Sequence, residues 1–154
     1  MNTSKLTIIA GVRRFFLYHA SAYVQYPLIT PSSAVFGITR KCNSRCSYCP
    51  IWKLNSTNLE QPSLDEAKEA LRQLALLGVR KVTISGGEPL LWPHLPELVR
   101  YGAKEQGLII NVLTNGLLLN GERGYTLVEA GVSVIGLSLD SLRPEVYFAL
   151  RGVA

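Results

Sequence analysis

Hydrophobic runs of strand length alternate with segments of helical periodicity along most of the chain. Four apolar runs predict strands over residues 34–39, 81–85, 108–114 and 132–139. Between them, apolar residues at helical spacing predict helices over about 63–77, 94–106 and 122–130, and Pro144 opens another. Ser63 and Glu66 predict a capping box at the start of the first of these helices. A strand–helix repeat of this kind gives parallel strands joined by right-handed crossovers. We therefore expect an α/β fold, either a barrel or a doubly wound sheet.

The first 33 residues do not follow this repeat. They combine basic and aromatic side chains, as in Arg13-Arg14-Phe15-Phe16-Leu17-Tyr18, which is typical of a helix at a membrane interface. Packing of this leader over the body of the fold is the alternative. Ser21, Gln25, Pro27 and Pro31 make the segment a poor membrane span, and its start lacks the features of a secretion signal. We predict a helical leader over 1–33 in a cytoplasmic protein, with association to a membrane surface as an option.

The composition is that of a globular domain, but the charge is unevenly distributed. The chain has 154 residues, of which 47% are hydrophobic and 18% charged, and a net charge of +5. These values exclude disorder, collagen and coiled coil. No acidic residue precedes Glu60, so the first 59 residues carry +7 and the remaining 95 carry −2. A surface of one sign attracts acidic proteins, anionic lipids, nucleic acid or phosphorylated substrates, and part of the charge could instead balance a bound anionic cofactor.

Three cysteines lie within eight residues, directly after the first predicted strand. Cys42, Cys46 and Cys49 have the spacing C-x3-C-x2-C, and an odd, clustered set is a poor framework for disulfides. Three thiolates can hold one metal centre. A structural zinc site needs four protein ligands, and the two histidines, His19 and His94, lie in other segments. The triplet favours an iron–sulfur cluster with one open iron, with zinc plus an outside ligand, or cysteines without a metal, as alternatives.

Polar or glycine-rich turns also follow the other three predicted strands, as Gly86-Gly87-Glu88-Pro89, Asn115-Gly116 and Asp140-Ser141. The carboxyl ends of parallel strands share one edge, where such folds place their sites. Two glycines at a strand end let the backbone approach a ligand and leave its N–H and C=O groups available, and Glu88 offers an acceptor for an amino group. A tight strand–helix connection is the alternative for this turn.

The motif C-x3-C-x-aromatic-C together with Gly-Gly-Glu-Pro resembles the radical S-adenosylmethionine (radical SAM) superfamily, over about residues 34–152. The resemblance implies that Cys42, Cys46 and Cys49 ligate a [4Fe-4S] cluster whose fourth iron binds S-adenosyl-L-methionine. It implies further that one residue stacks on the adenine and that four hold the methionine amino group. These are Tyr48, and then Gly86, Gly87, Glu88 and Pro89. The positions that would contact the methionine carboxylate and the ribose are Thr114, Asn115, Ser138 and Asp140.

Each of the weaker assignments has a structural alternative. Thr114-Asn115-Gly116 could form a turn, and Ser138 could be a small residue within a strand. Asp140 could cap the helix near Pro144, and Tyr48 could be a core residue.

The chemistry that the resemblance implies is reductive cleavage of S-adenosyl-L-methionine to a 5′-deoxyadenosyl radical, which abstracts hydrogen from a substrate. The protein positions the sulfonium and shields the radical from water. No residue of the chain is identified as a general acid or base, and the substrate is unknown: a peptide, lipid, tRNA or small molecule. An acidic electron donor such as flavodoxin or ferredoxin is expected near the cysteines, at Arg40, Lys41, Arg45 and Lys53.

Radical SAM cores resemble a partial, TIM-like barrel of six strand–helix units, and four strands are predicted here. We therefore expect residues 34–154 to be the N-terminal two thirds of such a core, truncated after about four parallel strands. A non-catalytic iron–sulfur or zinc-binding module is the alternative function. A strand–helix fragment whose basic face binds RNA or lipid is another.

Overall fold

The computed structural model describes residues 3–56 and 61–153. The chain divides into two compact units, Met1–Pro31 and Ser32–Ala154.

The first unit consists of one helix and the turn after it. Helix α1 runs over Thr3–Val24. Ser21 Oγ donates to Leu17 O (2.7 Å) and accepts from Leu28 N (2.9 Å), which turns the chain back. Phe15, Phe16, Tyr18 and Tyr23 are exposed within the unit. No helix among the described residues has the length and apolarity to cross a membrane. Surface association stays a prediction, which flotation with anionic liposomes at two salt concentrations tests.

The second unit is built on one parallel sheet of four strands. The strands are β1 (Ser33–Thr39), β2 (Lys81–Gly86), β3 (Ile109–Thr114) and β4 (Val134–Leu137), in the spatial order β1-β2-β3-β4. Each strand pairs in parallel with the one that follows it in sequence. The predicted α/β fold with parallel strands is confirmed.

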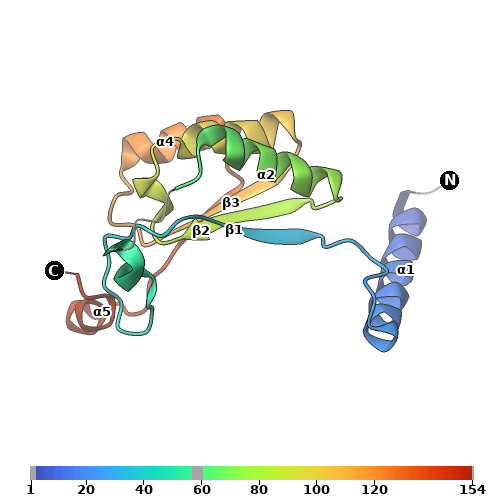
Figure 1. Ribbon diagram of the computed structural model, residues 1–154, viewed down its shortest axis with the longest axis horizontal. Coiled ribbons are helices and arrows are strands. Elements are labelled where there is room, and N and C mark those ends of the chain that lie inside the picture. The colour runs from blue at the N-terminus through green and yellow to red at the C-terminus, as the bar shows by residue number, and fades with distance from the viewer. Residues whose placement is uncertain (1–2, 57–60, 154) are drawn as a thin grey trace. The chain divides into compact units, whose positions relative to one another are not determined.

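Helices α2 (Leu64–Leu76), α3 (Leu95–Arg100) and α4 (Gly121–Ala130) connect successive strands, and α3 continues as a π-helical turn over Tyr101–Glu105. Figure 1 shows α2 and α4 on the same side of the sheet. The predicted capping box is formed, since Ser63 Oγ accepts from Glu66 N and the Glu66 carboxylate accepts from Ser63 N. The core lies between these helices and the sheet, where Leu71, Ile84, Leu98, Ile110 and Val112 are completely buried.

The opposite face of the sheet is open in this unit. Val35 is 75% exposed between half-buried neighbours in β1, and Leu113 is 43% exposed between buried neighbours in β3. In β2 and β3 the apolar residues at even-numbered positions lie on the face that the helices cover. This alternation fixes the pairing register of the two strands, because a shift by one residue would expose these side chains.

The fourth strand is shorter than the sequence predicts. The prediction of 132–139 is wrong at both ends, since β4 covers only Val134–Leu137. Val132 N donates to Leu127 O and so belongs to the end of α4. Beyond Leu137 the chain turns away toward helix α5 (Pro144–Arg151), whose C-terminal end returns to the loop that carries the cysteines.

Candidate functional site

A cavity of about 170 Å³ lies at the carboxyl edge of the sheet. We call it the cysteine cavity, because all three cysteines line it. Of the residues predicted for the site, nine line this cavity: Cys42, Cys46, Tyr48, Cys49, Gly86, Gly87, Thr114, Asn115 and Ser138. Segments from the ends of all four strands thus meet at one place. Glu88, Pro89 and Asp140 are not among the lining residues.

The three cysteines are thiols and differ in exposure. Cys46 is 7% exposed, whereas Cys42 and Cys49 are half-buried. Burial raises the pKa of the Cys42 thiol, and the N–H of Ser44, which donates to Cys42 Sγ over 3.4 Å, partly opposes this increase. Within residues 3–56 and 61–153, no three His, Cys, Asp or Glu side chains gather as around a single metal ion. Three thiols that line one cavity are, however, the donor set of an iron–sulfur cluster, and in this respect the residues fit that cofactor.

The backbone conformation at the end of β2 requires glycine at positions 86 and 87. A Cβ on Gly87 would lie 2.2 Å from Lys41 O, and Gly86 adopts a φ of +124°. Gly87 N donates to Thr39 O (2.7 Å) and Glu88 N donates to Lys41 O (2.8 Å). The expectation that the N–H groups of the two glycines are available to a ligand is therefore wrong for Gly87. The two hydrogen bonds hold the start of the cysteine loop, residues 40–49, against the end of β2.

Glu88 has a different environment from the one expected of a ligand for an amino group. Its side chain is completely buried, and its carboxylate accepts hydrogen bonds from Leu90 N (3.0 Å), Thr114 Oγ1 (2.7 Å) and Asn115 N (2.8 Å). Three acceptor sites of this carboxylate thus already serve the chain, and its expected contact with the amino group of a ligand stays a prediction. Glu88 joins the ends of β2 and β3, and Pro89 is buried beside it as the first residue of a short 3-10 helix, Pro89–Leu91.

Asn115 connects β3 to the cysteine loop. Its Nδ2 donates to Asn43 Oδ1 (2.7 Å) and to Ser44 Oγ (3.0 Å), and its Oδ1 accepts from Leu117 N (3.0 Å). The turn expected at Thr114-Asn115-Gly116 is present, with Gly116 at a φ of +82°. Thr114 and Asn115 of this turn also line the cavity, so the turn is compatible with the expected contact to a cofactor, which stays a prediction.

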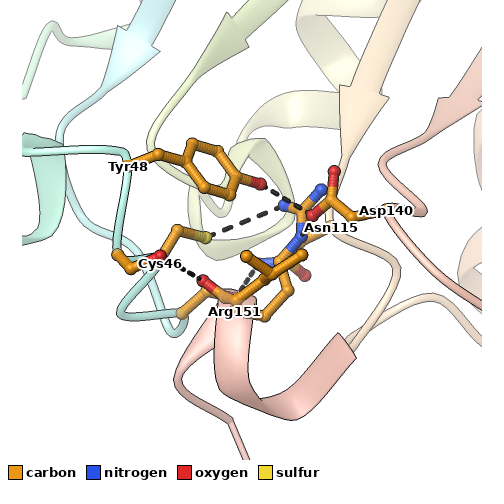
Figure 2. A network of polar contacts seen from close by, with 8 residues as sticks. Cys46, Tyr48, Asn115, Asp140 and Arg151 are labelled. Atoms are coloured by element: carbon orange, nitrogen blue, oxygen red, sulfur yellow. Dashed lines mark hydrogen bonds and ion pairs between the residues drawn. The ribbon is translucent and has the colours of Figure 1, made fainter. Parts of the chain in front are cut away.

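Tyr48 and Asp140 form a pair at the rim of the cavity. Tyr48 Oη donates to Asp140 Oδ2 over 2.7 Å, and this bond raises the pKa of Tyr48 to about 12 and lowers that of Asp140. Tyr48 is 57% exposed, so it is not a core residue. Asp140 does not cap α5, since the residue at that N-cap is Arg143. Figure 2 shows both side chains with Arg151, whose Nε lies 2.5 Å from Asp140 Oδ2.

Several lining residues were not predicted from the sequence. Arg151 comes from the far end of α5, and Trp52 from a 3-10 helix over Ile51–Ser56, where its Nε1 donates to Cys46 O (3.0 Å). Neither position belongs to a local motif, so no sequence signal pointed to them. Ser44 and Ser85 adjoin predicted site residues and could have been included on that ground.

The four basic residues near the cysteines are exposed. We call Arg40, Lys41, Arg45 and Lys53 the basic rim. Lys53 Nζ lies 5.5 Å from the centre of the Trp52 ring. Three residues of the basic rim thus belong to the cysteine loop, and Lys53 follows it in the sequence.

Comparison with known proteins gives one family. A profile of the Radical SAM superfamily matches residues 36–154. A GTP 3′,8-cyclase of Chlorobaculum tepidum is 40% identical over 114 residues, which are 73% of this chain and 34% of that protein. An Fe-coproporphyrin III synthase of Methanosarcina barkeri is 37% identical over 109 residues, 71% of this chain and 27% of that protein.

Solved structures agree with this assignment. Streptococcus suis SuiB bound to S-adenosylmethionine aligns with a TM-score of 0.64 at 25% identity, over 80% of this chain and 27% of SuiB. Methylornithine synthase (PylB) has the same fold, with a TM-score of 0.65 at 23% identity over 82% of this chain and 38% of that one. The chain spans about a third of the length of the curated relatives it matches. Its four parallel strands are part of a TIM-like radical SAM fold, and the chain belongs to the radical SAM superfamily.

Proposed function

We propose that this chain is part of a radical SAM enzyme, in which Cys42, Cys46 and Cys49 hold a [4Fe-4S] cluster and the cysteine cavity receives S-adenosyl-L-methionine. The observation that carries the proposal is the meeting of the three thiols with the ends of the other three strands around one cavity. The family profile and the S-adenosylmethionine-bound relative support it. Bound there, the two cofactors would supply the radical chemistry that removes a hydrogen atom from a substrate.

The chain's own residues hold this cavity in shape. The hydrogen bonds of Glu88 fix the end of β2 to the end of β3, and those of Asn115 fix β3 to the cysteine loop. Because Gly87 has no Cβ, the backbone of Lys41 can lie closer to it than a larger residue would allow. The cavity is thus pre-formed by hydrogen bonds within the chain, which lowers the entropic cost of ordering it around a cofactor.

The relatives do not single out a substrate. Two of them bear the names of different enzymes, GTP 3′,8-cyclase and Fe-coproporphyrin III synthase, yet match over a similar share of this chain. The likeness therefore supports the radical chemistry that such enzymes share rather than one reaction.

Anaerobic reconstitution with iron and sulfide tests the proposal. We expect about four irons and four sulfides per chain, an electron paramagnetic resonance signal after reduction, and a change in that signal when S-adenosyl-L-methionine is added. Cys42→Ser, Cys46→Ser and Cys49→Ser should each lose the cluster. Ser47→Ala, which changes a side chain of the same loop without removing a thiol, should keep it.

Two other outcomes would contradict the proposal. A chain that takes up zinc and no iron would be a zinc-binding module. A chain that binds the cluster but whose signal does not respond to S-adenosyl-L-methionine would be a non-catalytic iron–sulfur module.

We also propose that the basic rim docks an acidic electron donor of the flavodoxin or ferredoxin type. Four exposed cations lie in or directly after the loop that would hold the cluster. Opposite charges on two proteins accelerate and orient their encounter.

A further inference from the structure

The C-terminal end of α5 binds the cysteine loop on both sides of Cys46. Arg45 N donates to Arg151 O (3.0 Å), and Ser47 N donates to Leu150 O (2.9 Å). The last carbonyls of a helix have no partner within the helix and need one elsewhere. Here the two neighbours of Cys46 supply the donors, so α5 fixes the backbone at this cysteine.

The side chain of Arg151 reaches the sulfur of the same cysteine. Its Nη1 donates to Cys46 Sγ over 3.8 Å, and its Nε faces Asp140 Oδ2 at 2.5 Å (Figure 2). The guanidinium carbon lies 5.8 Å from the centre of the Tyr48 ring and 5.9 Å from that of Tyr147. Arg151 is only 8% exposed. The guanidinium is therefore held on several sides, with one N–H directed at the thiol.

The charges in this network are arranged so that a positive group faces the sulfur. A guanidinium stays protonated in proteins, and burial is costly for it unless an anion compensates the charge. Asp140 provides that anion on the side of Nε, while Nη1 faces Cys46.

We propose that Arg151 is a positioning residue for the cluster, which holds the sulfur of Cys46 and makes the cluster easier to reduce. The inference rests on the proposed function, because it requires Cys46 to be a cluster ligand. Hydrogen bonds to the sulfurs and nearby charge set the reduction potential of iron–sulfur clusters. A donated N–H and a positive charge both stabilise the reduced cluster, whereas the carboxylate of Asp140 opposes them.

The test is the midpoint potential of the reconstituted chain, measured by redox titration with electron paramagnetic resonance detection and without S-adenosyl-L-methionine. Arg151→Gln removes the charge but keeps a polar side chain, and its potential should be more negative than that of the parent chain. Arg143→Gln removes one positive charge from the exposed start of the same helix and serves as the matched control. Its potential should remain that of the parent chain.

The outcomes separate this inference from the proposed function. An Arg151→Gln chain that binds the cluster at the parent potential overturns the role of Arg151, and so does an equal shift in Arg143→Gln. If circular dichroism shows that Arg151→Gln does not fold, Asp140→Asn decides, because loss of the opposing carboxylate should make the potential more positive. An unchanged or more negative potential in Asp140→Asn then overturns the inference. Failure of the parent chain to bind iron and sulfide contradicts the proposed function instead.

Discussion

The carboxylate of Glu88, just beyond β2, accepts a hydrogen bond of 2.7 Å from the hydroxyl of Thr114 at the end of β3. The second carboxylate oxygen accepts from Asn115 N, and Leu90 N donates to the first. Glu88 and Thr114 are buried, so these bonds are shielded from water. A residue that the family resemblance places at the cofactor is thus also the link between two strand ends.

Glu88→Gln should destabilise the fold. The amide replaces one carboxylate oxygen by a group that donates, so a buried donor of the chain loses its acceptor, at a cost of about 1–3 kcal/mol. Urea unfolding followed by circular dichroism measures this change. Glu129→Gln, at an exposed position of α4, should stay within about 0.5 kcal/mol of the parent chain. Equal stabilities of the two variants would mean that the bonds of Glu88 contribute no net stability.

The periodicity of the sequence was sufficient to predict the sheet. The strands and their parallel order follow from apolar runs separated by helical patterns, and a capping box at Ser63 and Glu66 marked the start of α2. Convergence of the cysteines with Gly87 and Thr114 also followed, because parallel strands end at one edge. These features depend on local pattern and on topology, both of which a single sequence carries.

The partners of individual polar groups could not be predicted in this way. Arg151 lies 105 residues after Cys46 in sequence, and its approach depends on how α5 folds back after β4. The availability of the Gly87 N–H was misjudged because Thr39 O reaches it only in the folded chain. Contacts of this kind depend on tertiary packing, which produces no residue spacing that could be recognised in the sequence.

Gly87→Ala should prevent the normal seating of the cysteine loop. The new Cβ would meet Lys41 O at 2.2 Å, and because this atom belongs to the backbone the loop must shift. We expect a destabilisation of about 1–3 kcal/mol and reduced uptake of iron and sulfide. Gly124→Ala is the matched control, since no atom lies within 4 Å of its Cβ in the interior of α4. It should stabilise the chain by about 0.5–1 kcal/mol, so the two variants differ in sign, and a Gly87→Ala chain as stable as Gly124→Ala would contradict the close approach.

Tyr48 should ionise well above the ordinary pH for a tyrosine. Its bond to Asp140 raises its pKa to about 12 from an ordinary value of about 10. Absorbance of tyrosinate at alkaline pH, taken as the difference between the parent chain and Tyr48→Phe, isolates this group. In Asp140→Asn the same difference should titrate closer to the ordinary value. A Tyr48 titration that does not move in Asp140→Asn would show that another group raises the pKa.

The same shifts determine when the Tyr48–Asp140 pair stabilises the fold. The raised pKa of Tyr48 gives a contribution that is complete below about pH 10 and is lost as the pH rises toward about 12. The lowered pKa of Asp140 gives a contribution that is present above the ordinary pKa of an aspartate and is lost as the pH falls through the lowered value. The difference in unfolding free energy between the parent chain and Tyr48→Phe should therefore be flat near neutral pH and shrink at both extremes. A difference that grows above pH 10 would reverse the assigned sign.

Charge reversal in the basic rim should slow enzymatic reduction of the cluster and leave chemical reduction unchanged. Arg45→Glu with Lys53→Glu replaces two exposed cations beside the cysteine loop by anions, which repel an acidic donor. Stopped-flow reduction by flavodoxin should slow by about tenfold or more at low salt, with a smaller effect at high salt, since screening weakens the repulsion. Arg80→Glu with Lys81→Glu makes the same change in charge at the opposite, amino edge of the sheet and should have a much smaller effect. Equal slowing with flavodoxin and with dithionite would place the defect in the cluster itself and contradict docking at the basic rim.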